Sequence, residues 1–222
     1  MLFNKKLSII IPAYNEEKTL KSVVLKCLRL GDVIVINDCS SDKSFEILNK
    51  INSKNLKIIN NRYRLGYDGS LNKGINFSLK KNYKFLVTYD ADDQFYYKDI
   101  IKFTKYLKKN YQIVVGVRPY KQRFIENIFA YILDKKYAIK DPFCGLKGYN
   151  SNIFSSNKKV FTYNSIGTEI LINNLNNIKN IKQLKIKIKP RLDKPRFGNI
   201  ITGNYKLLLA IINGFRILKW KS

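Results

Sequence analysis

The sequence predicts an α/β fold in which a mostly parallel central sheet is flanked by helices. Apolar runs of strand length alternate with stretches of helical periodicity over about the first half of the 222 residues. The run at 84–90 is continuous and apolar enough to be a central strand. No internal repeat and no linker rich in Pro, Gly or Ser interrupts the pattern, so we expect one domain with a substantial core.

Each expected element has a local signal in the sequence. The first strand, residues 7–13, contains Pro12 near its end, and a helix is expected from Asn15, with Glu16 and Glu17 in its first turn, where the helix dipole favours carboxylates. Ser and Asp residues supply caps for an amphipathic helix within 40–51. The remaining strands of this half are expected at 32–38, 56–60, 84–90 and 111–118, and the remaining helices at 66–81 and 97–109.

After residue 118 the alternation loosens. Helices with apolar faces are expected at 124–137 and 167–178, and residues 181–190 alternate like a strand exposed on one face. The last segment, 204–220, has an apolar run shorter than the roughly 20 residues that a membrane span requires. Its Lys and Arg residues and Trp220 make it amphipathic, so we expect a helix that lies on a membrane surface; packing on the domain is the alternative.

Composition excludes several classes of site. The chain has no histidine, which removes Ser-His and Cys-His nucleophile systems and His-ligated metals. Three cysteines without a C-x-x-C pair favour free thiols, and the apolar run at the N-terminus is too short for a signal peptide, so a cytoplasmic location is expected. The net charge of +26 indicates an anionic partner or, equally, a compositional bias toward Lys.

Polar residues follow three of the expected strands. They are residues 12–16, Asp38, and the group Asp90, Asp92 and Gln94. Carboxyl ends of parallel strands meet at one edge, so these side chains should converge there. Two carboxylates at a strand end repel unless a cation or proton intervenes, and oxygen ligands favour Mg²⁺ or Mn²⁺. A lone Asp such as Asp42 is instead typical of a helix cap or a turn.

Magnesium is commonly held by carboxylates together with substrate phosphates, so the sequence predicts a phosphorylated ligand. Arginine suits forked recognition of phosphate oxygens. The candidates are Arg118, Arg123, Arg191 and Arg196, each of which has the alternative of being a solvated surface residue.

Four motifs together resemble the family 2 glycosyltransferases of the GT-A fold. In chain order they are "SIIIPAYNEEKTL", "VIVINDCSSDKS", "GYDGSLNKGI" and "YDADDQ". Three looser motifs resemble the subset that contains dolichyl-phosphate mannosyltransferase and bacterial polyprenyl-phosphate glycosyltransferases: "VVGVR", "DPFCGLKGY" and "PRLDKPRFGN". The resemblance covers roughly residues 7–205, and implies a catalytic domain at 1–198 followed by the amphipathic segment 199–222.

The resemblance also implies roles for individual residues. It implies that the nucleotide is bound by Pro12, Ala13, Tyr14, Glu16, Asp38 and Asp90. It also implies that the metal is bound by Asp90, Asp92 and Gln94, and that phosphates of the donor or acceptor are bound by Arg118 and Arg196. Asp141 and Gly145 belong to an acceptor-side loop, where the family often has Ser-Gly-Phe and this chain has "CGL", which leaves the acceptor open.

The implied reaction is an inverting transfer of sugar from a UDP- or GDP-sugar to a polyprenyl phosphate at the cytoplasmic face of a membrane. An ionised phosphate needs no general base. A sugar hydroxyl, the rival acceptor, needs one, and Asp141 or Glu169 is the candidate; Glu169 has the alternative of a first-turn helix carboxylate. A nucleic-acid-binding module is disfavoured, because the acidic strand ends would repel phosphate without a metal.

Overall fold

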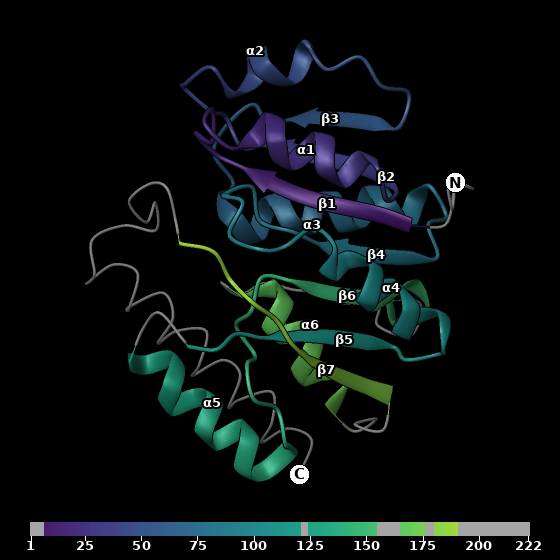
Figure 1. Cartoon of the computed structure of the whole chain (residues 1–222), viewed down its shortest axis with the longest axis vertical. Helices are drawn as coiled ribbons and strands as arrows, with labels where there is room; N and C mark the ends of the chain where they lie inside the picture. Colours follow the sequence, from purple (N-terminus) through teal and green to yellow (C-terminus); the bar gives the residue numbers. More distant parts are fainter. Residues whose placement is uncertain (1–6, 121–123, 155–164, 176–179, 191–222) are drawn as a thin grey trace.

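The computed structural model describes residues 7–120, 124–154, 165–175 and 180–190. These residues form a seven-stranded sheet of order β3-β2-β1-β4-β6-β5-β7 with helices on both faces (Figure 1). The strands are β1 (Leu7–Ala13), β2 (Asp32–Asn37), β3 (Leu56–Asn60), β4 (Phe85–Thr88), β5 (Ile113–Val117), β6 (Lys147–Asn150) and β7 (Ile181–Lys185). The helices are α1 (Leu20–Leu28), α2 (Ser44–Asn49), α3 (Gly66–Lys80), α4 (Asp99–Lys108), α5 (Phe124–Tyr137), α6 (Ile166–Asn173) and the 3₁₀ helix η1 (Ser151–Phe154).

The sheet is mostly parallel, as predicted. β1 pairs in parallel with β2 and β4, and β2 with β3. β6 runs antiparallel between β4 and β5, with Lys147 opposite both Thr88 and Val115, and β5 pairs in parallel with β7. The order of strands along the chain reverses between β1 and β4, which is the position where open α/β sheets bind ligands at their carboxyl edge.

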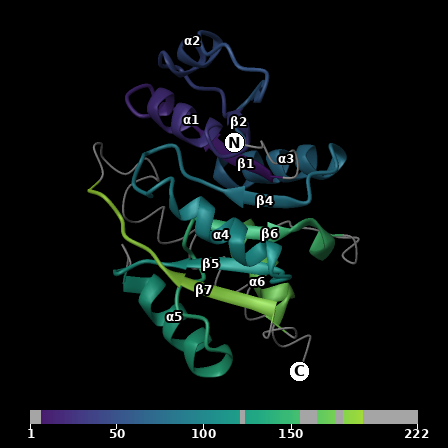
Figure 2. The ribbon, with the colours of Figure 1, turned by 45° about the vertical axis from the view of Figure 1, so that its right-hand side comes forward.

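Alternate residues of the central strands pack into two hydrophobic cores, one on each face of the sheet. Ile9 and Ile11 of β1 pack toward α1, α2 and α4, whereas Ile10 lies on the opposite face with α3, α5 and α6. This alternation follows from the two-residue period of a strand. Helices therefore cover both faces of the sheet, as the two views show (Figures 1 and 2), and the strands can be apolar on both sides.

Glycine at position 74 lets α3 approach the sheet. A Cβ there would overlap the Ile10 side chain and would also lie too close to Ile36 Cδ1, at 2.6 Å. α3 is the helix that follows β3, so this close contact fixes how its N-terminus is placed at the carboxyl edge of the sheet.

One local prediction was wrong, and one strand was missed. The helix expected from Asn15 begins at Leu20, because Asn15 adopts a left-handed φ of 54° and Glu16 and Glu17 lie in the preceding loop. β6 was not predicted, since "KGYN" has no strand periodicity of its own and is a strand because β4 and β5 flank it.

The helix predicted at 124–137 is confirmed as α5, the helix at 167–178 as the shorter α6, and the strand at 181–190 as the shorter β7. The amphipathic segment predicted at 199–222 lies outside the described residues, as do Arg123, Arg191 and Arg196. Among the described residues, no helix has the length and apolar character to cross a bilayer.

Candidate active site

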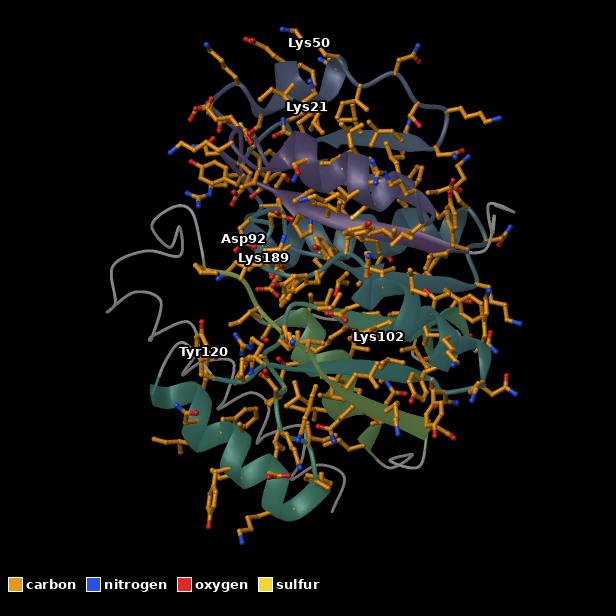
Figure 3. All side chains as sticks on the ribbon, viewed as in Figure 1. Lys21, Lys50, Asp92, Lys102, Tyr120 and Lys189 are labelled. Carbon is orange, nitrogen blue, oxygen red and sulfur yellow. The ribbon has the colours of Figure 1, made fainter. Side chains whose placement is uncertain are left out.

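The carboxyl ends of β2, β1 and β4 are neighbours, and they bring together the three polar segments expected to converge. Residues 12–16 follow or end β1, Asp38 follows β2, and residues 90–94 follow β4. In Figure 3, Asp92 lies on the side toward which the β1 arrow points in Figure 1. One edge of the sheet thus carries these candidate donor-binding residues.

The loop after β1 is bonded to the loop after β2. The Asn15 amide donates to Ser40 Oγ at 3.0 Å, and the Glu16 amide donates to Ser44 Oγ at 2.9 Å. In return, the Ser41 amide donates to Asn15 Oδ1 at 2.8 Å. Pro12 and Ala13 are buried at the end of β1, so these bonds give a fixed shape to the loop in which Tyr14 lies.

Tyr14 is half-buried and carries the guanidinium of Arg64 on its ring, with Cζ 3.9 Å from the ring centre. Arg64 is an exposed residue of the segment between β3 and α3. Stacked planar groups of this kind attract both by cation–π interaction and by dispersion. The pair places a positive charge on an aromatic ring beside the loop after β1.

Asp38 anchors the start of α3. Its Oδ1 accepts from the Leu65 amide and its Oδ2 from the Gly66 amide, both at 2.8 Å, and Asn61 Nδ2 also donates to Oδ1 at 2.8 Å. A carboxylate at a helix N-terminus satisfies amides that have no partner within the helix. The structure therefore gives Asp38 an architectural role in addition to any contact with a nucleotide base.

Asp42 also has the role expected from sequence. Its Oδ1 accepts from the Ser44 amide at 2.9 Å and its Oδ2 from the Glu17 amide at 3.1 Å. The first of these bonds spans two residues, which is the pattern of an Asx turn ahead of α2.

Asp90 is enclosed by two segments that are distant in sequence. Tyr67 of α3 donates its hydroxyl to Asp90 Oδ1 at 2.9 Å. Gly145 lies so close that a Cβ there would overlap the Asp90 carboxylate. Burial, and next the charge of Asp92, raise the pKa of Asp90 from 3.8 to about 6. A nearby cation would offset the repulsion between the Asp90 and Asp92 carboxylates by compensating both charges.

Asp92 and Gln94 lie in the same loop and are partly buried. The Gln94 amide donates to Asp92 Oδ1 at 3.2 Å, and Gln94 Nε2 donates to the Lys189 carbonyl at 3.4 Å. No cluster of three or more acidic or Cys side chains suited to a metal occurs in the described part of the chain. Two carboxylates with an amide oxygen still fit Mg²⁺ or Mn²⁺, which complete their coordination with water and substrate phosphates.

Arg118 and Asp141 form an ion pair with two side-chain hydrogen bonds. Arg118 Nε donates to Asp141 Oδ2 at 2.8 Å, and Nη2 donates to Asp141 Oδ1 and Glu126 Oε2, each at 2.9 Å. The Arg118 amide adds a bond to Asp141 Oδ2 at 3.0 Å. Asp141 is completely buried and Arg118 retains only 10% of its side-chain exposure. In this conformation the pair is a structural unit between β5, α5 and the loop before β6.

Glu169 is 4% exposed and lies in the first turn of α6, in agreement with its alternative interpretation as a first-turn carboxylate. The structure does not bring it and Asp141 to an open surface. Gly167, two residues earlier, lies against Lys147 of β6, and burial lowers the pKa of that lysine.

Comparison with models of protein families identifies the family of this chain. Residues 8–184 match the model of glycosyl transferase family 2, which is more than half of the chain. The chain belongs to this family. It is therefore a glycosyltransferase, and it binds a nucleotide sugar.

Three curated relatives illustrate the proteins to which this glycosyltransferase is similar. An uncharacterized protein of Methanocaldococcus jannaschii is 35% identical over 158 residues, which are 62% of this chain and 69% of the relative. The UDP-N-acetylglucosamine–dolichyl-phosphate N-acetylglucosaminyltransferase of Methanococcus voltae is 27% identical, over 78% of this chain and 82% of its own. The undecaprenyl-phosphate 4-deoxy-4-formamido-L-arabinose transferase of Pectobacterium carotovorum is 26% identical, over 68% and 51% respectively.

Solved structures confirm the GT-A fold. Glucosyl-3-phosphoglycerate synthase from Mycobacterium tuberculosis, crystallised with Mn²⁺, UDP and phosphoglyceric acid, superposes with a TM-score of 0.74 at 13% identity. The match covers 95% of this glycosyltransferase and 79% of the synthase chain. At this sequence identity the similarity shows a shared fold alone.

Sequence reasoning did not find Tyr67, Arg64 or Lys147. Tyr67 contacts Asp90 only because α3 packs beside β4, and Arg64 contacts Tyr14 across two loops. Neither contact has a signal in a single sequence. Lys147 was overlooked because β6 itself was not predicted.

The raised pKa of Asp90 leads us to expect that the stability of this glycosyltransferase and the titration of Asp90 depend on pH in a defined way. An Asp whose folded pKa lies above its unfolded value stabilises the metal-free fold at pH below 3.8, and this contribution is lost as the pH rises through about 6. Mg²⁺ binds the deprotonated carboxylate, so added Mg²⁺ with UDP should lower the pH midpoint of the Asp90 titration. Carboxyl ¹³C NMR, with the resonance assigned through Asp90→Asn, should show a midpoint near 6 without metal. A midpoint near 4 in the metal-free protein would contradict the burial argument.

Proposed function

We propose that this glycosyltransferase is a metal-dependent, inverting enzyme that moves a sugar from a UDP- or GDP-sugar to a polyprenyl phosphate. The proposal deepens the family assignment in two respects, the metal and the acceptor. Its support comes from the carboxylates at the end of β4 and from the internal pairing of Asp141 with Arg118.

The donor side is built by the loops after β1, β2 and β4. The stacked pair of Tyr14 and Arg64 is suited to a nucleotide base and ribose, since both groups are planar and Arg64 is cationic. Asp90, Asp92 and Gln94 would hold Mg²⁺ or Mn²⁺ against the donor diphosphate. The bound metal would neutralise negative charge as it develops on the leaving nucleoside diphosphate. The loop keeps its carboxylates oriented through the Tyr67 and Gln94 hydrogen bonds before any ligand binds.

The observation that carries the acceptor assignment is the absence of an open general base among the described candidates. Both oxygens of Asp141 accept hydrogen bonds from Arg118, so a proton on Asp141 would displace a buried ion pair. Glu169 is buried in α6. A sugar hydroxyl must lose its proton during transfer, whereas a phosphate oxygen is already ionised. Because neither Asp141 nor Glu169 is open to an acceptor in the described structure, a phosphate acceptor is favoured.

The names of two relatives support the same acceptor class, since one acts on undecaprenyl phosphate and another on dolichyl phosphate. Attack by the phosphate oxygen opposite the leaving group, in a single displacement, would invert the anomeric centre. A polyprenyl phosphate resides in a membrane, so we place the enzyme at the cytoplasmic membrane surface. The predicted amphipathic segment 199–222 would supply the contact.

Transfer from a panel of radiolabelled UDP- and GDP-sugars tests the proposal. Each donor is incubated with short-chain polyprenyl phosphate or with the matching polyprenol, which lacks the phosphate, and with Mg²⁺, Mn²⁺ or a chelator. We expect organic-extractable label only with polyprenyl phosphate and only with metal. Label on the polyprenol or on a sugar hydroxyl, with none on the lipid phosphate, would contradict the acceptor; transfer in chelator would contradict the metal.

A further inference from the structure

Asp93 differs from its acidic neighbours because its carboxylate is bound by two lysines. Lys26 Nζ donates to Oδ1 at 3.2 Å and to Oδ2 at 3.0 Å, and Lys189 Nζ donates to Oδ2 at 2.9 Å. The Asp93 side chain is 20% exposed and each lysine side chain 30%. Asp93 also adopts a left-handed φ of 57°, which Asp and Asn tolerate better than most residues.

The segment after β7 is joined to the Asp93 loop by its backbone. The Lys189 amide donates to the Gln94 carbonyl at 2.8 Å, and the Gln94 side chain donates to the Lys189 carbonyl at 3.4 Å. Phe95 and Ile188 form an antiparallel bridge. The Lys189 ammonium also lies 5.2 Å from the ring centre of Tyr96. Residues 188–189 are therefore joined to residues 94–95 by an isolated antiparallel bridge and its flanking hydrogen bonds.

Three parts of the fold meet at the Asp93 carboxylate. Lys26 belongs to α1, Asp93 to the loop that carries Asp92 and Gln94, and Lys189 to the last described segment. In Figure 3, Asp92 and Lys189 are labelled next to each other, whereas Lys102 lies on a different part of the surface. The described chain ends one residue beyond Lys189, at Pro190.

We propose that Asp93 is a positioning residue, whose carboxylate uses Lys26 and Lys189 to hold the Asp92–Gln94 loop and residues 188–190 in a fixed relation. Its effect on metal binding rests on the function proposed above. Without the carboxylate, two ammonium groups that now share Oδ2 would face each other with no charge between them. Their repulsion would loosen the loop and the bridge between residues 94–95 and 188–189 together.

Asp93→Asn isolates the charge, since Asn has the same size and also tolerates the left-handed conformation. Lys102→Met is the matched control, because it breaks another Lys–Asp pair, the 2.8 Å contact with Asp99 on α4, away from the loop. Two readouts are measured: hydrogen–deuterium exchange of the Lys189 amide, with Val114 in β5 as internal reference, and the Kd of Mn²⁺ by electron paramagnetic resonance with UDP present.

We expect at least about tenfold faster exchange at Lys189 in Asp93→Asn, unchanged exchange at Val114, and a Mn²⁺ Kd raised about tenfold, the scale seen when groups that orient metal ligands are lost. Lys102→Met should match the wild type. Unchanged exchange at Lys189, or an unchanged Kd in a protein that binds Mn²⁺, would overturn the proposal. Faster exchange in a protein whose wild type binds no Mn²⁺ would support the positioning role and would count against the metal in the proposed function.

Discussion

Replacing Asp92 with Asn is expected to lower the rate of sugar transfer by about 100- to 1000-fold, the scale of losing one electrostatic contact to the transition state. The substitution removes one of the two negative charges after β4 but keeps an oxygen that can accept from the Gln94 amide. The fold should therefore be retained, and the metal should bind more weakly. The measurement is the initial rate with the best donor and acceptor, together with the midpoint of thermal unfolding.

Asp134→Asn, on the exposed side of α5, is the control for loss of one carboxylate. The Asp92→Asn protein should also show a lower Asp90 pKa, since the charge of Asp92 contributes to raising it. A transfer rate within about threefold of wild type would show that Asp92 does not act on the developing charge.

The second large effect is on stability. Asp141→Asn is expected to lower the free energy of unfolding by about 3–5 kcal/mol, because Arg118 would stay buried with Glu126 as its remaining carboxylate partner. For a domain of this size the loss corresponds to a decrease of the unfolding midpoint on the order of 10 °C. Chemical denaturation and calorimetry measure both quantities.

A double-mutant cycle separates this structural role from catalysis. Arg118→Met combined with Asp141→Leu should cost less than the sum of the two single changes, because no buried charge of this pair is then left uncompensated. If Asp141 were the general base for a hydroxyl acceptor, Asp141→Asn would instead abolish transfer while leaving unfolding unchanged. That result would reverse the acceptor assignment.

The convergence of polar residues at one sheet edge was predictable, because it follows from the parallel direction of β1, β2 and β4 alone. The start of α1 was not. Asn15 and Glu16 are excluded from the helix by bonds to Ser40, Ser41 and Ser44, which lie about 25 residues further along the chain. Local carboxylates favoured a helix there, but contacts between the two loops determined the backbone.

The pairing of Arg118 with Asp141 was equally hidden from sequence. An Arg that follows a strand has the same local signal whether it faces a phosphate or a buried carboxylate. The choice depends on how α5 and the loop before β6 fold back over the end of β5. The sequence therefore identified residues whose side chains could bind a ligand or take part in catalysis. The tertiary contacts determine which of these side chains are buried in internal pairs.

The antiparallel direction of β6 has an evolutionary consequence. The segment 118–146 leaves β5 and enters β6 at the same edge of the sheet, so replacing it as one cassette would keep the order of the strands, while its Phe129 and Leu133 would have to be matched to the core. The donor loops after β1 and β2 lie outside this cassette. It meets the loop after β4 at the contact of Gly145 with Asp90. Chimeras that swap 118–146 should therefore be able to change acceptor preference while inheriting the donor, provided that position 145 stays glycine.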